Sequence, residues 1–134
     1  MRIVKLADSF AVSEQIAPTE VAAIAAAGFR VLINNRPDNE VPGQPANADI
    51  AAAAADAGLE YHYLPVTAAS FPGPDIDTMR KLLNDGDGPV LAFCRSGTRC
   101  ANLWVASRDD HSRAEASSVA KSLGYDLGMS ARCT

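Results

Sequence analysis

The chain has 134 residues, the size of one domain, of which 48% are hydrophobic and 21% are charged. This balance is typical of a globular protein and excludes a disordered or fibrous one. Twelve basic against sixteen acidic side chains give a net charge of -4. That charge argues against a general nucleic-acid binder, because such proteins carry a basic face. No apolar run approaches the roughly 20 residues that span a bilayer, so no membrane partner is expected.

The cysteine count and the start of the chain predict a cellular compartment. Three cysteines, an odd number, are not typical of the disulfide framework of a small secreted domain. The first residues reach an acid at Asp8, too soon for a signal peptide. We therefore expect a cytoplasmic protein whose cysteines are free thiols, and we leave its oligomeric state open.

Strand-like and helix-like segments alternate from the start of the chain. The segment 10–16 predicts a short strand, and Pro18 opens an alanine-rich helix that Gly28 ends. The run 29–34 is short, β-branched and apolar, as in a buried strand. The loop 35–47 is polar and rich in turn residues, so we expect a functional or mobile surface loop.

The later elements continue this alternation and define the fold class. They are a helix over 48–57, a strand over 60–66, a loop over 67–74, a helix over 75–83, a turn over 84–89, a strand over 90–93 and helices over about 100–107 and 112–123. Strands separated by helices predict one α/β domain over residues 1–134, with a mainly parallel sheet of four to five strands flanked by helices. Ligands bind such sheets at the carboxyl ends of strands, here after Asn34, Val66 and Phe93.

A cysteine, a glycine and an arginine fall together after the strand predicted over 90–93. A short polar loop before a helix aims backbone N–H groups at one point, which attracts an anion and lowers the pKa of a thiol. Arg99 adds a planar fork suited to phosphate, and Gly97 is expected to adopt a conformation that a side chain would obstruct. We therefore interpret Cys94 as a thiolate nucleophile beneath an anion cradle; the alternative is a buried structural cysteine before an ordinary turn. The loop residues expected to bind the substrate are Arg95, Ser96, Gly97 and Thr98.

The sequence resembles two families. The Cys-x4-Arg spacing of residues 94–99 resembles the active-site loop of rhodanese-type sulfurtransferases. Nearly the whole chain resembles the bacterial phosphatase-like family found alone or as a domain of beta-lactamase-hydrolase-like proteins, through residues 33–38, 42–45, 63–66 and 88–99. The second resemblance implies a fold similar to that of dual-specificity and tyrosine phosphatases, and it implies a cysteine-dependent phosphatase.

Departures from the tyrosine-phosphatase pattern leave the general acid open. Those enzymes place five residues between the cysteine and the arginine, whereas this chain has four. Dual-specificity phosphatases carry an aspartic acid in the loop that here reads Thr-Ala-Ala-Ser over 67–70, and the next acids are Asp75 and Asp77. Asp38, after another strand, is a further candidate. Each has an alternative role, Asp75 and Asp77 as helix-start residues and Asp38 as a turn former.

Three other residues bear on the loop. Cys100 stands where related phosphatases carry a Ser or Thr whose hydroxyl is expected to face the nucleophile's sulfur. It is either a redox partner that forms a disulfide with Cys94 or a serine-sized residue packed at a helix start. Arg36 is either a second positive charge near the pocket or an ordinary exposed loop arginine, and Cys133 is expected to be incidental.

Three functions of different classes compete. In the first, Cys94 attacks the phosphomonoester of a small molecule or phosphoprotein and forms a cysteinyl-phosphate that water hydrolyses, without a metal or other cofactor. In the second, Cys94 takes sulfur from a sulfane-sulfur donor, which requires no aspartic acid. In the third, the domain senses an anion without turnover. Two separated histidines without an acid cluster do not predict a metal site. We favour the first function over the other two, because the phosphatase-like resemblance covers more of the chain than the rhodanese-like one.

Overall fold

A computed structural model describes residues 1–85 and 88–131 of the chain. The strands are β1 (Ile3–Ala7), β2 (Phe10–Ser13), β3 (Val31–Asn34), β4 (Glu60–Tyr63) and β5 (Val90–Phe93). The helices are a 3-10 turn (Pro18–Glu20), α1 (Val21–Ala26), α2 (Asn47–Ala57), α3 (Ile76–Asp85), α4 (Thr98–Ser107), α5 (Arg113–Ser122) and α6 (Gly128–Ala131). In these two described ranges, no helix has both the length and the apolar composition to cross a membrane.

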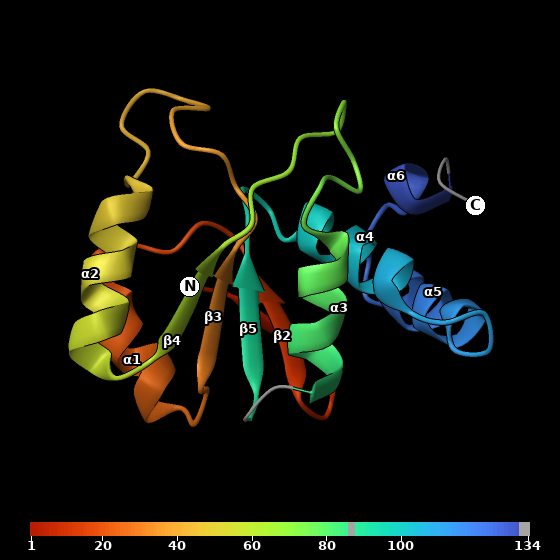
Figure 1. The fold of residues 1–134 in the computed structure, drawn as a ribbon, viewed down its shortest axis with the longest axis horizontal. Helices are drawn as coiled ribbons and strands as arrows, with labels where there is room; N and C mark the ends of the chain where they lie inside the picture. Colours follow the sequence, from red (N-terminus) through yellow and green to blue (C-terminus); the bar gives the residue numbers. More distant parts are fainter. Residues whose placement is uncertain (86–87, 132–134) are drawn as a thin grey trace.

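The five strands form one sheet in the order β1-β2-β5-β3-β4. Strands β2, β5, β3 and β4 are parallel, and β1 pairs antiparallel with β2 at the edge. Helices α1 and α2 lie on one side of the sheet, and α3, α4, α5 and α6 lie on the other (Figure 1). The structure thus confirms the predicted α/β class and the mainly parallel sheet flanked by helices.

Strand β5 lies at the centre of the sheet and fixes where the chain enters the loop that begins at Cys94. Its last residue, Phe93, is aligned with Ser13 of β2 on one side and with Asn34 of β3 on the other. The carboxyl ends of these three parallel strands therefore meet at one edge of the sheet, as the strand order requires. Cys94 follows directly at this edge.

Residues of β5 alternate between two hydrophobic clusters, one on each face of the sheet. Leu91 and Phe93 pack with residues of α1 and α2. Val90, Ala92 and Cys94 belong to the other cluster, which contains residues of α4. The period of two that runs through the strand thus carries the Cys94 side chain to the α4 side.

Several element bounds differ from those predicted. The segment expected as a strand over 10–16 leaves the sheet after Ser13, and the helix expected from Pro18 starts as a 3-10 turn. Strand β4 ends at Tyr63, two residues before Pro65, which has no N–H to donate to a neighbouring strand.

Two elements were not predicted, and part of one prediction cannot be compared. The edge strand β1 is half exposed, so it lacks the apolar run of a central strand, and α6 is only one turn long. The last helical residues of α3 fall in the turn expected over 84–89, and residues 86–87 of that turn lie outside the described residues. Cys133 also lies outside them.

The central strand offers a test of the packing. Replacement of Leu91, which is fully buried, by alanine should lower the free energy of unfolding by about 3 kcal/mol, because a cavity remains between β5 and α1. The matched control is Leu123→Ala, since Leu123 is 40% exposed; it should change the free energy by less than about 0.5 kcal/mol. Urea unfolding measures both, and equal losses would contradict the assigned core.

Candidate active site

The loop from Cys94 to Arg99 turns the chain from β5 into α4. Gly97 has φ +90°, a left-handed conformation that side chains other than glycine's rarely adopt. An added Cβ at Gly97 would meet only ordinary contacts of 3.5 Å, so the backbone angle, rather than space, requires glycine. The N–H of Gly97 points back and donates to Cys94 Sγ over 3.1 Å. The structure confirms the special backbone conformation expected at this residue.

Cys94 is a buried thiol whose surroundings favour the thiolate. The Cys100 thiol donates a hydrogen bond to the Cys94 sulfur, and the backbone N–H groups of Cys100, Ser96 and Gly97 also point to it. Burial opposes these contacts, but together they lower the pKa of Cys94 to about 6. Burial and the neighbouring Cys94 raise the pKa of Cys100 well above the ordinary value, so Cys100 keeps its proton and remains a donor.

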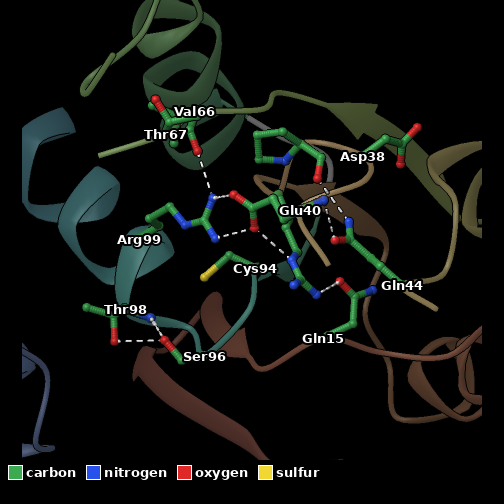
Figure 2. A network of polar contacts seen from close by, with 12 residues as sticks. Gln15, Asp38, Glu40, Gln44, Val66, Thr67, Cys94, Ser96, Thr98 and Arg99 are labelled. Carbon is green, nitrogen blue, oxygen red and sulfur yellow. Dashed lines mark hydrogen bonds and ion pairs between the residues drawn. The ribbon is translucent and has the colours of Figure 1, made fainter. Parts of the chain in front are cut away.

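The Arg99 guanidinium is held by two groups from other parts of the chain (Figure 2). Its Nη1 and Nη2 donate to the two carboxylate oxygens of Glu40 over 2.8 and 2.7 Å, in a bidentate ion pair. Its Nη1 also donates to the backbone carbonyl of Val66 over 2.9 Å. These contacts bring the loop after β3 and the loop after β4 to the start of α4.

The contacts of Arg99 use only part of its donors. A guanidinium has five N–H groups, of which Glu40 and Val66 engage three. Among the contacts of the described residues, the Nε–H and the second Nη2–H of Arg99 have no partner. These two groups form one edge of the fork, which is the geometry that binds two oxygens of a phosphate or similar oxyanion.

Glu40 also pairs with a second arginine. The Nε of Arg36 donates to Glu40 over 2.8 Å, and its Nη1 donates to Gln15 over 3.0 Å. Arg36 is only 3% exposed, so its interpretation as an ordinary exposed loop arginine is wrong. It lies close to the site through Glu40, as the other interpretation expected, because a buried guanidinium requires partners such as these.

The loop that carries Glu40 is fixed by its own polar contacts. Gln44 accepts from the backbone N–H of Glu40 over 3.1 Å and donates to the carbonyl of Pro37 over 2.9 Å. The sequence marked the loop 35–47 as functional or mobile but did not identify Glu40. The sequence does contain one indication of this ion pair, because Glu40 lies four residues after Arg36 and has the opposite charge.

Glu40 is a carboxylate rather than a proton donor. The hydrogen bond from Arg99 lowers its pKa, burial opposes this, and the contact with Arg36 lowers it further. A general acid must hold a proton near neutral pH. The geometry therefore assigns Glu40 to the orientation of Arg99.

The remaining loop residues lie at the surface. The hydroxyls of Ser96 and Thr98 are hydrogen-bonded over 3.1 Å, and Ser96 Oγ also accepts from the backbone N–H of Thr98 (Figure 2). These contacts hold the shape of the loop, as expected. Arg95 is exposed, and its backbone carbonyl accepts from the N–H of Gln15 over 3.3 Å.

The structure separates the three candidate acids. Asp38 accepts from the backbone N–H of Asn47 over 2.7 Å at the start of α2, and its side chain points away from Cys94 (Figure 2). Asp77 pairs with Arg80 one helical turn further along α3. Among the contacts of the described residues, neither carboxylate meets Cys94 or Arg99, and the catalytic role expected of Asp38 stays a prediction.

Asp75 shares one neighbour with Arg99. It lines a cavity of about 10 Å³ together with Val66, and the carbonyl of Val66 is the one that accepts from Arg99. Asp75 is half-buried at the start of α3. Of the three aspartates, it is the one that shares a neighbour with the arginine fork.

The part of the chain that the structure describes contains no cluster of metal ligands. Across residues 1–85 and 88–131, no three His, Cys, Asp or Glu side chains are grouped so that they could hold a metal ion.

Known proteins share this arrangement of the chain. Residues 2–110 match the family described as "Beta-lactamase hydrolase-like protein, phosphatase-like domain". The chain belongs to this family. The beta-lactamase hydrolase-like protein of Agrobacterium fabrum (strain C58) is 32% identical over 135 residues, an alignment that covers 98% of this chain and 31% of that protein. The Xylella fastidiosa (strain 9a5c) protein is 37% identical over 96% of this chain and 30% of its own length.

The phosphatase-like chain is thus about a third as long as the curated relatives that it matches. Its fold is also similar to solved structures. A candidate phosphatase from Neisseria meningitidis is 35% identical with a TM-score of 0.78, over 96% of this chain and 92% of that one. A candidate dual specificity phosphatase from mouse, crystallised with zinc tungstate, has a TM-score of 0.63 at 18% identity, over 98% and 82% of the two chains. The family and the dual-specificity-phosphatase fold predicted from the sequence are confirmed, and they support a phosphatase.

The ion pair between Arg99 and Glu40 can be tested by titration. Arg99→Ala should raise the pKa of Glu40 toward its ordinary value, because the hydrogen bond from Arg99 is the largest cause of the lowered value. Arg36→Ala is the matched control. It should raise the pKa of Glu40 less, since the hydrogen bond from Arg36 lowers that pKa less than the one from Arg99 does. Carboxyl-carbon NMR across acidic pH measures the three proteins. An unchanged pKa in Arg99→Ala would contradict the assigned contact.

The stabilised thiolate predicts a pH profile for alkylation. In a Cys133→Ser background, the rate at which iodoacetamide modifies Cys94 should reach half its maximum near pH 6, because the thiolate forms above the pKa of about 6. Cys100→Ala should move this midpoint upward, since the thiol donor is lost, whereas Cys100→Ser retains a hydroxyl donor and should move it less. Mass spectrometry follows the reaction. A parent midpoint at the ordinary thiol value of about 8.5 would disprove the assignment.

Proposed function

We propose that this domain hydrolyses phosphomonoesters through a cysteinyl-phosphate on Cys94. The observation that carries the proposal is the placement of a favoured thiolate and a partly free guanidinium edge on one loop, since Arg99 interacts electrostatically with Cys94. The family and the structural neighbours support a phosphatase. The substrate is the phosphate of a small molecule or of a phosphoprotein.

The first step forms a bond between sulfur and phosphorus. The Cys94 thiolate attacks the phosphorus atom, the bond between phosphorus and the ester oxygen breaks, and the leaving oxygen departs with the electron pair. The free edge of Arg99 and the backbone N–H groups of the loop bind the non-bridging oxygens, where negative charge is concentrated. Glu40 keeps that edge directed to the phosphate, because it holds the opposite edge of the guanidinium.

The second step releases inorganic phosphate. A water molecule attacks the phosphorus atom, the sulfur–phosphorus bond breaks, and Cys94 leaves as a thiolate. The Cys100 thiol and the loop N–H groups favour this step, because they stabilise the negative charge that returns to the Cys94 sulfur. The thiolate is then ready for another cycle.

Asp75 is the acid that we propose for the leaving oxygen. It directly precedes α3 and is the first acid after the stretch 67–70, where the resemblance places the acid of dual-specificity phosphatases. It also shares Val66 with the arginine fork. A proton from its carboxyl group would neutralise the alkoxide or phenoxide as it departs.

Sulfur transfer is a second candidate, favoured by one specific observation. Of the aspartates Asp38, Asp75 and Asp77, none makes a direct contact with Cys94 or Arg99 among the contacts of the described residues. A sulfurtransferase requires no such acid. The Cys94 thiolate would take the outer sulfur of thiosulfate and release sulfite, and cyanide would then remove that sulfur as thiocyanate and restore the thiolate.

A paired assay on one reduced preparation distinguishes the two reactions. One arm follows hydrolysis of p-nitrophenyl phosphate from acidic to neutral pH, and the other follows thiocyanate formed from thiosulfate and cyanide. We expect hydrolysis that Cys94→Ser lowers by at least about a thousandfold, because a neutral hydroxyl is a weaker nucleophile than a thiolate. Thiocyanate formation without hydrolysis would overturn the phosphatase proposal in favour of sulfur transfer.

The same hydrolytic arm tests the acid with matched aspartate variants. Asp75→Asn should lower kcat by about a hundredfold, as loss of a general acid does. Asp38→Asn and Asp77→Asn are the controls, because their carboxylates are engaged at α2 and within α3. Equal effects of all three substitutions would exclude Asp75 as the acid.

A further inference from the structure

Two side chains outside the nucleophile loop reach it from the strands next to β5. Strands β2 and β3 flank β5, and their last residues, Ser13 and Asn34, are both aligned with Phe93. Gln15 and Arg36 each lie two residues beyond those strand ends. Because the three parallel strands end at the same edge of the sheet, both residues are brought to the place where the nucleophile loop begins.

Gln15 and Arg36 complete a ring of hydrogen bonds that starts and ends on the nucleophile loop. The backbone N–H of Gln15 donates to the carbonyl of Arg95 over 3.3 Å. The side-chain Oε1 of Gln15 accepts from Arg36 Nη1 over 3.0 Å, and Arg36 Nε donates to Glu40 over 2.8 Å. The Glu40 carboxylate then holds Arg99, where the loop enters α4; Figure 2 shows the part of the ring from Gln15 to Arg99.

We propose that Gln15 is a positioning residue of the anion site, which acts through the buried Arg36. Gln15 does not touch the substrate. It holds Arg36, and Arg36 in turn orients the carboxylate that directs the free edge of Arg99. The inference rests on the part of the proposed function in which Arg99 binds an oxyanion, and it is independent of whether Cys94 then receives phosphorus or sulfur.

The side-chain amide of Gln15 has one orientation that satisfies its neighbours. Its Nε2 donates to the backbone carbonyl of Ile16 over 2.9 Å, which leaves Oε1 for the Arg36 guanidinium. The reverse orientation would set N–H against N–H and oxygen against oxygen. Because the amide is neutral, it accepts from Arg36 without adding a negative charge to a site that receives an anion.

The contact with Gln15 matters because Arg36 is buried. Only 3% of Arg36 is exposed, so water cannot fully replace an acceptor that its guanidinium loses. Glu40 Oε1 accepts from both arginines, from Arg36 Nε and from Arg99 Nη2. A displacement of Arg36 therefore displaces the same oxygen that holds Arg99.

The variants Gln15→Leu and Gln15→Met test this by removing the side-chain acceptor, while the backbone bond to Arg95 remains. Gln15 is only half-buried, so we expect both variants to fold, and circular dichroism checks each. Calorimetric titration of the reduced protein with tungstate, a phosphate-like dianion, measures the anion site without turnover. Both substitutions should raise the Kd for tungstate by about tenfold, as loss of a hydrogen bond to a charged group does. Thr19→Val removes an exposed hydroxyl nearby in the chain and is the control, with an expected change of less than about twofold.

A double-mutant cycle distinguishes positioning from a general loss of structure. If Gln15 acts through Arg36, Gln15→Leu should weaken tungstate binding in the parent and have little further effect in an Arg36→Ala background. An equal loss in both backgrounds would overturn the proposal, because the effect would then not pass through Arg36. An unchanged Kd in both Gln15 variants would overturn it as well.

Carboxyl-carbon NMR gives a second measurement that needs no ligand. Gln15→Leu should raise the pKa of Glu40 toward its ordinary value, because the contact with Arg36 is one of those that lower it. A Glu40 pKa that stays as low as in the parent would contradict the proposal. The outcomes also separate the two proposals of this article's site: hydrolysis without coupling between Gln15 and Arg36 removes only the role of Gln15, and coupling without hydrolysis removes only the phosphatase reaction.

Discussion

The bidentate contact between Arg99 and Glu40 is the interaction on which the rest of the site depends. It joins two loops whose residues are 59 positions apart in the chain. The Glu40 carboxylate binds one edge of the Arg99 guanidinium, and the Val66 carbonyl accepts from one further N–H of it. The orientation of the remaining edge is therefore fixed. A long arginine side chain loses much rotamer entropy when it binds a substrate. Here much of that loss has already occurred in the folded protein.

The central strand supplies the second constraint. Because side chains alternate along β5, the residue after Phe93 must lie on the α4 side of the sheet. That side also holds the first turn of α4, where the backbone N–H and the thiol of Cys100 are directed to the Cys94 sulfur, and the N–H groups of Ser96 and Gly97 reach it from the loop before the helix. A buried thiol in apolar surroundings would normally keep its proton. The loop geometry reverses this preference, since it surrounds the sulfur with donors.

The predictable features are those encoded by residues close together in the sequence. The nucleophile loop could be found because Cys94, Gly97 and the helix start are neighbours, and each has a local physical reason. Glu40 could not be identified, because its contact with α4 depends on how the loop 35–47 folds. The two interpretations of Arg36 could not be separated for the same reason, since a charged residue is buried only where tertiary partners satisfy it. The edge strand β1 lacks a distinctive pattern because it is half exposed.

The sharing of Glu40 between two arginines also sets the electrostatic character of the empty site. Two guanidiniums, Arg36 and Arg99, stand against one carboxylate and the Cys94 thiolate, so the formal charges cancel, and the whole chain carries a net charge of -4. Such a site exerts little long-range attraction on an anion. Recognition therefore occurs at hydrogen-bonding distance, through donors held in place. For the anionic substrate that we propose, we therefore expect capture to depend on the fit of its oxygens to the loop rather than on electrostatic steering, with little influence of ionic strength on the rate.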